Sequence, residues 1–211
     1  STFTSSLENY QPTVENCDDS DDIDGSWSDA HANFLSNLSE EETDDLLKFA
    51  HKKELETKNF LFQAGDRSNN VYVVAEGCVK LFQISAAGKE TILWYSFPGE
   101  IFGIAELFSG GDRQIYANAI ENSVVYAVKR SDFTRFINKH PEVAMRAIGI
   151  LSARVRTLGH VLAGLTTDNV EARIARLLFR FAHVSSVLPC TKIRNNELCV
   201  NVRLTHQDIA N

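Results

Sequence analysis

Short apolar segments separated by glycine-containing turns dominate residues 60–128. The segments are rich in β-branched and aromatic residues, and pairs such as Gly65-Asp66 and Gly110-Gly111 lie between them. Segments of this kind at roughly ten-residue intervals are typical of the strands of a β-sandwich or jelly-roll barrel. We therefore predict an α+β protein whose N-terminal part is a jelly-roll β-barrel.

Patterns typical of helices precede and follow these segments in the sequence. Upstream, residues 36–54 offer Ser39 as an N-cap, acidic residues in the first turn and lysines in the last, which predicts one short helix. Downstream, residues 131–140 predict a second short helix that stops near Pro141. Both helices are expected to flank the barrel.

A long apolar seam follows Pro141. Its members recur at alternating spacings of four and three residues, a heptad pattern that continues for about three repeats. A helix that packs only on its own barrel needs just a wider, less regular stripe. We therefore favour a helix that pairs with a second copy, and packing within the chain is the alternative. The seam consists of Ala144, Ile148, Leu151, Val155, Leu158, Leu162 and Leu165.

The C-terminal part predicts a separate unit. A second amphipathic helix is expected from Val170, after a short hinge. Near the end of the chain, Thr205 with Asp208 three residues on is a capping arrangement that opens another helix.

Charge is distributed very unevenly. Residues 1–47 hold 13 acidic residues and no lysine or arginine, so 28 − 13 = 15 acidic residues stand against all 21 basic residues in 48–211. Residues 1–28 are too polar to order themselves by burial, which predicts a flexible acidic tail. A basic body is compatible with a polyanionic partner, and ordinary surface charge explains it equally well.

Cysteine and histidine placement argues against a metal site. Cys17, Cys78, Cys190 and Cys199 form no CxxC pair, and no histidine lies within residues 60–128. A cupin-type barrel enzyme needs several histidines on adjoining strands, so we predict a protein that is not an enzyme and holds no metal.

The apolar runs are too short for a membrane helix. Charge breaks them before the roughly 18 residues that such a helix needs, and the N-terminus lacks the basic-then-apolar order of a signal peptide. We therefore expect a cytoplasmic protein with no membrane partner.

Three segments carry a resemblance to a known family. Residues 61–77 (LFQAGDRSNNVYVVAEG) closely resemble the opening signature of a cyclic-nucleotide-binding barrel. Residues 140–182 and the terminal VRLTHQDIAN add a long helix, an ARIA-type helix and an LTxxDIA helix, in that order. In this order the segments resemble the CRP/FNR family of bacterial transcription regulators, and the details below favour its branch that does not bind cyclic AMP.

The resemblance implies a homodimer that binds double-stranded DNA at a two-fold symmetric operator and can contact RNA polymerase. It divides the chain into an acidic flexible tail (1–28), an effector-sensing β-barrel domain with flanking helices (29–135), a dimerisation helix (136–166) and the start of a winged helix-turn-helix DNA-binding domain (167–211), which is expected to be present only in part. DNA-phosphate contacts are expected from Thr205, His206 and Gln207.

The resemblance also points to an effector loop at residues 102–119. Members that bind cyclic AMP carry a Gly-Glu-Leu step and an Arg-Ser or Arg-Ala step, where this chain has Gly103-Ile104-Ala105 and Arg113-Gln114. On the long helix, Leu158 and Gly159 stand where an adenine-binding Thr-Ser pair is expected. Cyclic AMP is therefore not the expected effector.

The FGIA turn resembles the FGVL-type turn of the 2-oxoglutarate-responsive members. By this resemblance, Arg113 in the loop and Arg154 on the long helix match positions where such members place charge against a carboxylate or phosphate. A guanidinium group fits a planar carboxylate, so we predict a small organic anion as the effector. In the alternative interpretation, Arg113 forms a surface ion pair with Asp112 or Glu106, and Arg154 ties the long helix to the barrel. The predicted effector-binding residues are Phe102, Gly103, Ile104, Ala105, Arg113, Gln114, Arg154 and Leu158.

Two further interpretations stay open at the level of the sequence. One is a haem- or redox-sensing member of the same family, for which His160 on the long helix is the candidate haem-binding residue. Neither haem nor an iron–sulfur cluster is the expected cofactor. The other is a cyclic-nucleotide-binding-type regulatory module, such as those attached to kinases and channels.

Overall fold

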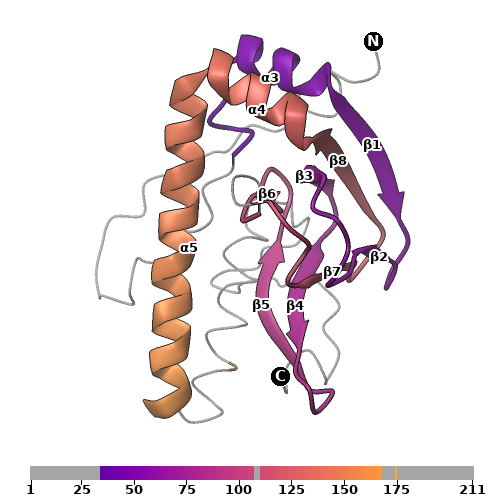
Figure 1. Cartoon of the computed structure of the whole chain (residues 1–211), viewed down its shortest axis with the longest axis vertical. Coiled ribbons are helices and arrows are strands. Elements are labelled where there is room, and N and C mark those ends of the chain that lie inside the picture. Colours follow the sequence, from indigo (N-terminus) through magenta and orange to yellow (C-terminus); the bar gives the residue numbers. More distant parts are fainter. Residues whose placement is uncertain (1–33, 107–109, 168–173, 175–211) are drawn as a thin grey trace, which may run out of the picture.

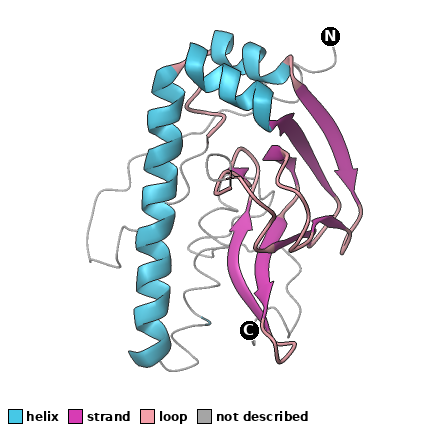
Figure 2. Cartoon of the chain, in the orientation of Figure 1, coloured by secondary structure: helices cyan, strands magenta, loops and turns pink. Residues whose placement is uncertain are grey.

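The computed structural model describes residues 34–106, 110–167 and 174 of the chain. Within these residues, helix α3 (Glu40–Leu47) precedes a set of short strands, and helices α4 (Arg130–Lys139) and α5 (Pro141–Thr167) follow them. Figure 2 shows α3 and α4 across one end of the strands and α5 running alongside them.

The strands form two antiparallel four-stranded sheets. One sheet has the order β1-β8-β3-β6 and the other has the order β2-β7-β4-β5 (Figure 1). Apart from the consecutive pair β4–β5, the neighbours in each sheet are not consecutive in sequence, which is the arrangement of the jelly-roll sandwich that the strand pattern predicts. The bounds are β1 (Ala50–Leu55), β2 (Phe60–Phe62), β3 (Asn70–Glu76), β4 (Val79–Ile84), β5 (Glu90–Ser96), β6 (Ile101–Phe102), β7 (Tyr116–Ala119) and β8 (Ser123–Lys129).

A first core cluster contains many aromatic side chains from both sheets. Tyr72 stacks on both Phe62 and Phe102, with ring centroids 5.7 and 5.4 Å apart, and Phe62 lies tilted against Phe102 at 6.5 Å. Trp94 of β5 and Ala153 of α5 belong to the same cluster, so the long helix reaches this core directly. This aromatic core cluster borders the predicted effector loop, because Phe102 begins that loop.

A second cluster, the helical core cluster, joins the helices to the first sheet. Phe133 and Phe136 of α4 pack with Val143 and Ile150 of α5 and with Leu46 of α3. The burial of these apolar side chains fixes the N-terminal half of α5 against the sandwich.

The first predicted helix is shorter than its sequence pattern suggests. Ser39 is the N-cap, and it forms a capping box with Glu42, as expected. The expected lysine-rich last turn is wrong, because the helix ends at Leu47 and Ala50–Leu55 form strand β1. The whole of β1 pairs with β8, and this long-range pairing outweighs the local preference of the lysines for a helix terminus.

The long helix α5 buries one face and exposes another. Val143, Ile150 and Ala153 are buried against the barrel side. In contrast, the seam residues Ile148, Val155, Leu158 and Leu162 have exposed fractions of 53%, 68%, 40% and 68%.

The remaining seam positions lie at the edge of this face or beyond what is described. Ala144 and Leu151 are partly buried against the helical core cluster, and the side chain of Leu165 is not described. The continuous helix is confirmed, and its pairing with a second copy stays a prediction.

Several predictions concern residues outside the described part. These are the acidic tail (1–28), nearly all of the C-terminal unit (167–211), and the DNA-contact residues Thr205, His206 and Gln207. Among the described residues, no helix is long and apolar enough to span a bilayer.

Candidate functional site

The effector loop begins with a tight turn at Gly103. Its φ is 74°, in the left-handed region that favours glycine. A Cβ at this position would lie 3.0 Å from an Arg113 guanidinium nitrogen and 3.2 Å from Tyr72. The turn therefore brings the loop backbone into close contact with the Arg113 side chain.

Arg113 is buried beneath this turn, with an exposed fraction of 2%. Its Nη1 donates to the Gly103 carbonyl oxygen at 3.0 Å and to Glu106 Oε2 at 2.9 Å. Its Nη2 donates to the carbonyl oxygen of Asn70. The guanidinium also lies over the Phe62 ring, with Cζ 4.4 Å from the centroid.

The backbone of Arg113 is fixed by the Gly65-Asp66 turn. Its amide donates to the Asp66 carbonyl at 2.7 Å, and its own carbonyl accepts from the Gly65 amide at 2.9 Å. Gly65 has φ of 93°, which the predicted Gly65-Asp66 turn requires. The arginine is thus held in place by the turn that belongs to the barrel signature.

A second arginine joins the long helix to the barrel. Arg154 Nη2 donates to Glu100 Oε2 at 3.4 Å, and the Arg154 Cζ lies 5.0 Å from the Trp94 ring centroid. The same Glu100 oxygen accepts from Trp94 Nε1 at 3.1 Å and lies 3.4 Å from Ser96 Oγ. Glu100 therefore gathers donors from β5 and from α5 around one buried carboxylate.

The environment of Arg154 is unusual for a guanidinium. Burial lowers its pKa, while the Glu100 charge and hydrogen bond oppose that change. Its Nε atom is buried and has no hydrogen-bond partner in the described part of the chain. A buried donor of this kind is costly to leave unsatisfied, so the site has capacity for one more acceptor.

The structure brings together only part of the predicted site. Gly103 contacts Arg113, and Phe102 and Arg113 both lie against Tyr72. Arg154 reaches the same aromatic core cluster through Trp94. Ile104 is buried in the helical core cluster instead.

Three other predicted residues point elsewhere or are accessible from solvent. Ala105 is exposed. Gln114 is exposed too, and its side chain donates to the Asp112 carbonyl at 2.9 Å. Leu158 lies on the exposed seam of α5.

The alternative interpretation named the right partners for the two arginines. Arg113 pairs with Glu106, and Arg154 ties α5 to the barrel through Glu100. It is wrong in one respect, because Arg113 is almost fully buried and its ion pair is not a surface one. Both arginines thus hold internal carboxylates, and neither is an open anion-binding group in this conformation.

Sequence reasoning missed Glu100 and its neighbours Trp94 and Ser96. A carboxylate within the apolar segment FPGEIFG was the available signal, since a charged residue there needs a buried partner. The Asn70 carbonyl has no sequence signal, because any residue supplies that group.

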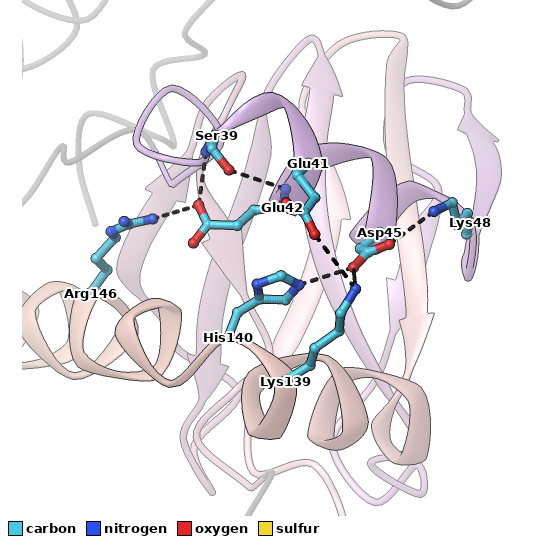
Figure 3. A network of polar contacts seen from close by, with 8 residues as sticks. All are labelled: Ser39, Glu41, Glu42, Asp45, Lys48, Lys139, His140 and Arg146. Carbon is cyan, nitrogen blue, oxygen red and sulfur yellow. Dashed lines mark hydrogen bonds and ion pairs between the residues drawn. The ribbon is translucent and has the colours of Figure 1, made fainter.

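A separate polar network joins α3 to the α4–α5 junction (Figure 3). Glu42 accepts from the Ser39 amide at 2.8 Å and from Arg146 Nη1 of α5 at 2.9 Å. The Ser39 backbone hydrogen bond and Arg146 lower the pKa of Glu42.

Asp45 is the other acceptor in this network (Figure 3). It holds Lys139, Lys48 at 2.9 Å and His140 at 3.0 Å, and the hydrogen bond from Lys139 is the largest of the causes that lower its pKa. Since Lys139 ends α4 and His140 precedes α5, the network fixes the direction in which α5 leaves the barrel.

No group of three or more potential metal ligands of the His, Cys, Asp or Glu type occurs among the residues that the structure describes. His160 lies within α5, and its side chain is not described.

Comparison with known proteins agrees with this architecture. The cyclic nucleotide-binding domain family matches residues 52–140. The Cyclic AMP receptor protein of Thermus thermophilus is 30% identical over 161 residues, which cover 76% of this chain and 74% of that protein. The Anaerobic regulatory protein of Haemophilus influenzae is 25% identical over 142 residues, which cover 67% of this chain and 55% of that protein.

A solved structure supports the same relationship. The crystal structure of the Thermus thermophilus catabolite activator protein superposes with a TM-score of 0.58 at 29% identity, and the match covers 72% of this chain and 71% of that one. With the sandwich and the long helix, these matches define the chain as a non-enzymatic, effector-sensing regulator of transcription. The chain belongs to the CRP/FNR family, and the matched relatives include both proteins named for cyclic AMP and proteins named for anaerobic regulation.

Proposed function

We propose that this chain acts as a DNA-binding homodimer whose barrel binds a small organic anion other than cyclic AMP. The bound anion shifts the dimer between arrangements that differ in DNA affinity. One observation carries the proposal: the buried guanidinium of Arg113 in the loop and the largely buried guanidinium of Arg154 in α5 border the same aromatic core cluster.

This placement gives a ligand a means of control. Arg113 belongs to the barrel and Arg154 to the helix that leaves it, so an anion that contacts both groups links the two elements. A ligand shifts a conformational equilibrium only by contacting its two states differently. The buried Nε of Arg154 is an additional donor for such an anion.

The loop sequence argues against cyclic AMP. By the family resemblance, Ile104 stands in place of the ribose-binding glutamate, and its side chain is buried at 4% exposure in the helical core cluster. Gln114 replaces the small hydroxyl or methyl residue beside the phosphate arginine. Each missing hydrogen-bond partner costs on the order of 1–3 kcal/mol of binding free energy.

The seam of α5 supports the homodimer. Four of its apolar residues stay exposed along a single continuous helix, which is the arrangement that a two-stranded coiled coil covers. DNA binding follows from membership of the family, and Thr205, His206 and Gln207 are the proposed phosphate contacts.

The proposal is tested by isothermal titration calorimetry of the full chain with 2-oxoglutarate and, separately, with cyclic AMP. We expect binding of the first and none of the second. Arg113→Lys and Arg154→Lys each keep the charge but remove the planar fork, so we expect each to weaken binding at least tenfold. Arg156→Lys, an exposed position on the same helix, is the control.

Binding of cyclic AMP would contradict the proposal of a small organic anion other than cyclic AMP, and it would favour the cyclic-nucleotide type of sensor. Unchanged 2-oxoglutarate affinity in both arginine variants would place the site elsewhere. DNA selected from a random library, with and without the bound anion, then measures whether the ligand changes DNA affinity.

A further inference from the structure

We infer that Glu106 is an internal competitor for the effector: its carboxylate occupies Arg113 in the ligand-free protein, and an incoming anion must displace it. The inference rests on the proposed function, since it concerns the same arginine. It assigns Glu106 as the residue that sets the effector concentration to which the protein responds.

The geometry of the pair supports exchange rather than permanent structural neutralisation. Arg113 is fixed from several directions. Its side chain donates hydrogen bonds to the Gly103 and Asn70 carbonyls, and its backbone is hydrogen-bonded to the 65–66 turn. Glu106, in contrast, is the more accessible partner, with 13% of its side chain exposed against 2% for Arg113. When the pair separates, the arginine stays in place and the carboxylate moves toward solvent.

The chemistry of the pair is the chemistry of the proposed ligand. A carboxylate hydrogen-bonded to a guanidinium at 2.9 Å is the interaction that a small carboxylate ligand would make. Glu106 lies seven positions before Arg113 in the same loop, so its local concentration is far above that of a free metabolite.

This competition has a quantitative consequence. The apparent affinity for an anion equals the intrinsic affinity multiplied by the fraction of molecules in which Glu106 has left Arg113. Replacing the carboxylate by a neutral amide weakens its hydrogen bond to the guanidinium and raises that fraction. We therefore expect Glu106→Gln to bind anions more tightly than the natural chain does.

The test compares full-length natural protein, Glu106→Gln and the double variant Glu106→Gln/Arg113→Lys by calorimetry, with 2-oxoglutarate and with inorganic phosphate as probes. Glu106→Gln is expected to lower the dissociation constant about tenfold, and the double variant to abolish that gain. Asp112→Asn is the matched control, because Asp112 is an exposed carboxylate beside Arg113 whose removal changes the loop charge equally. Thermal unfolding of each variant reports whether the fold is kept.

Each outcome separates this inference from the proposed function. Binding by the natural chain with no gain in Glu106→Gln, or the same gain in Asp112→Asn, overturns the inference and leaves the effector site standing. Binding only in Glu106→Gln would mean that no anion displaces Glu106 from Arg113 in the natural chain, and it would overturn both the inference and an anion as the natural effector. Absence of binding in every variant overturns both.

Discussion

At the scale of single residues, the buried Arg113 and the largely buried Arg154 have similar surroundings. Arg113 and Arg154 each combine a carboxylate from the barrel with an aromatic ring, Phe62 in one case and Trp94 in the other. Taking such charges out of water is costly, and the paired carboxylate together with additional hydrogen bonds offsets the cost. Removing one member of a pair therefore has a larger effect than removing both.

This reasoning predicts the stability of variants at Glu100. Glu100→Gln leaves Arg154 buried without its counter-charge, and we expect it to lower the free energy of unfolding by about 3 kcal/mol. The double variant Glu100→Gln/Arg154→Met removes both charges and should recover part of that loss. Urea unfolding of the natural chain, both single variants and the double variant gives the coupling energy. Additive losses would mean that the pair does not act as a unit.

At the scale of elements, α3 is attached to the rest of the protein by charge as well as by packing. Leu46 enters the helical core cluster, while Glu42 and Asp45 hold the α4–α5 junction (Figure 3). Because the folded protein lowers the pKa of both carboxylates, their contribution to stability depends on pH.

The sign of this dependence follows from the lowered pKa. Asp45 contributes stability above its ordinary pKa of 3.8, and the contribution is lost as the pH falls below that value toward the folded-state pKa. The natural chain should therefore exceed Asp45→Asn in urea midpoint at about pH 6, and the difference should shrink at about pH 3. Asp44→Asn, an exposed neighbour on α3, should show no such trend. A constant difference between natural chain and Asp45→Asn across this range would assign the effect to packing.

At the scale of the whole molecule, α5 has one face against the barrel and one apolar face that nothing in the described part of the chain covers. Val143, Ile150 and Ala153 are buried while Ile148, Val155 and Leu158 are exposed, so the two faces lie about 140° apart around the helix axis. The helix can therefore serve its own barrel and a second copy at the same time.

The oligomeric state tests this arrangement. Leu158→Glu places a charge in the exposed seam, where burial against a second copy would be costly, so we expect monomers in sedimentation velocity. Arg156→Glu introduces the same side chain at an exposed position outside the seam and should leave the dimer intact. Circular dichroism controls for loss of helix. A stable dimer of Leu158→Glu would place the interface on another surface.

The sequence by itself determined the sandwich, the Ser39 cap, the long helix and its exposed seam. These features follow from local rules, namely strand periodicity, capping chemistry and heptad spacing, which operate over a few neighbouring residues. The tertiary structure alone decided that Ala50–Leu55 is a strand, because its pairing with β8 is long-range. It also decided which long-range acceptors the two arginines hold. Glu100 lies 54 positions before Arg154, and Asn70 lies 43 positions before Arg113, so only the folded chain brings these groups together. Burial then strengthens these contacts, since charges and dipoles interact more strongly where water is excluded.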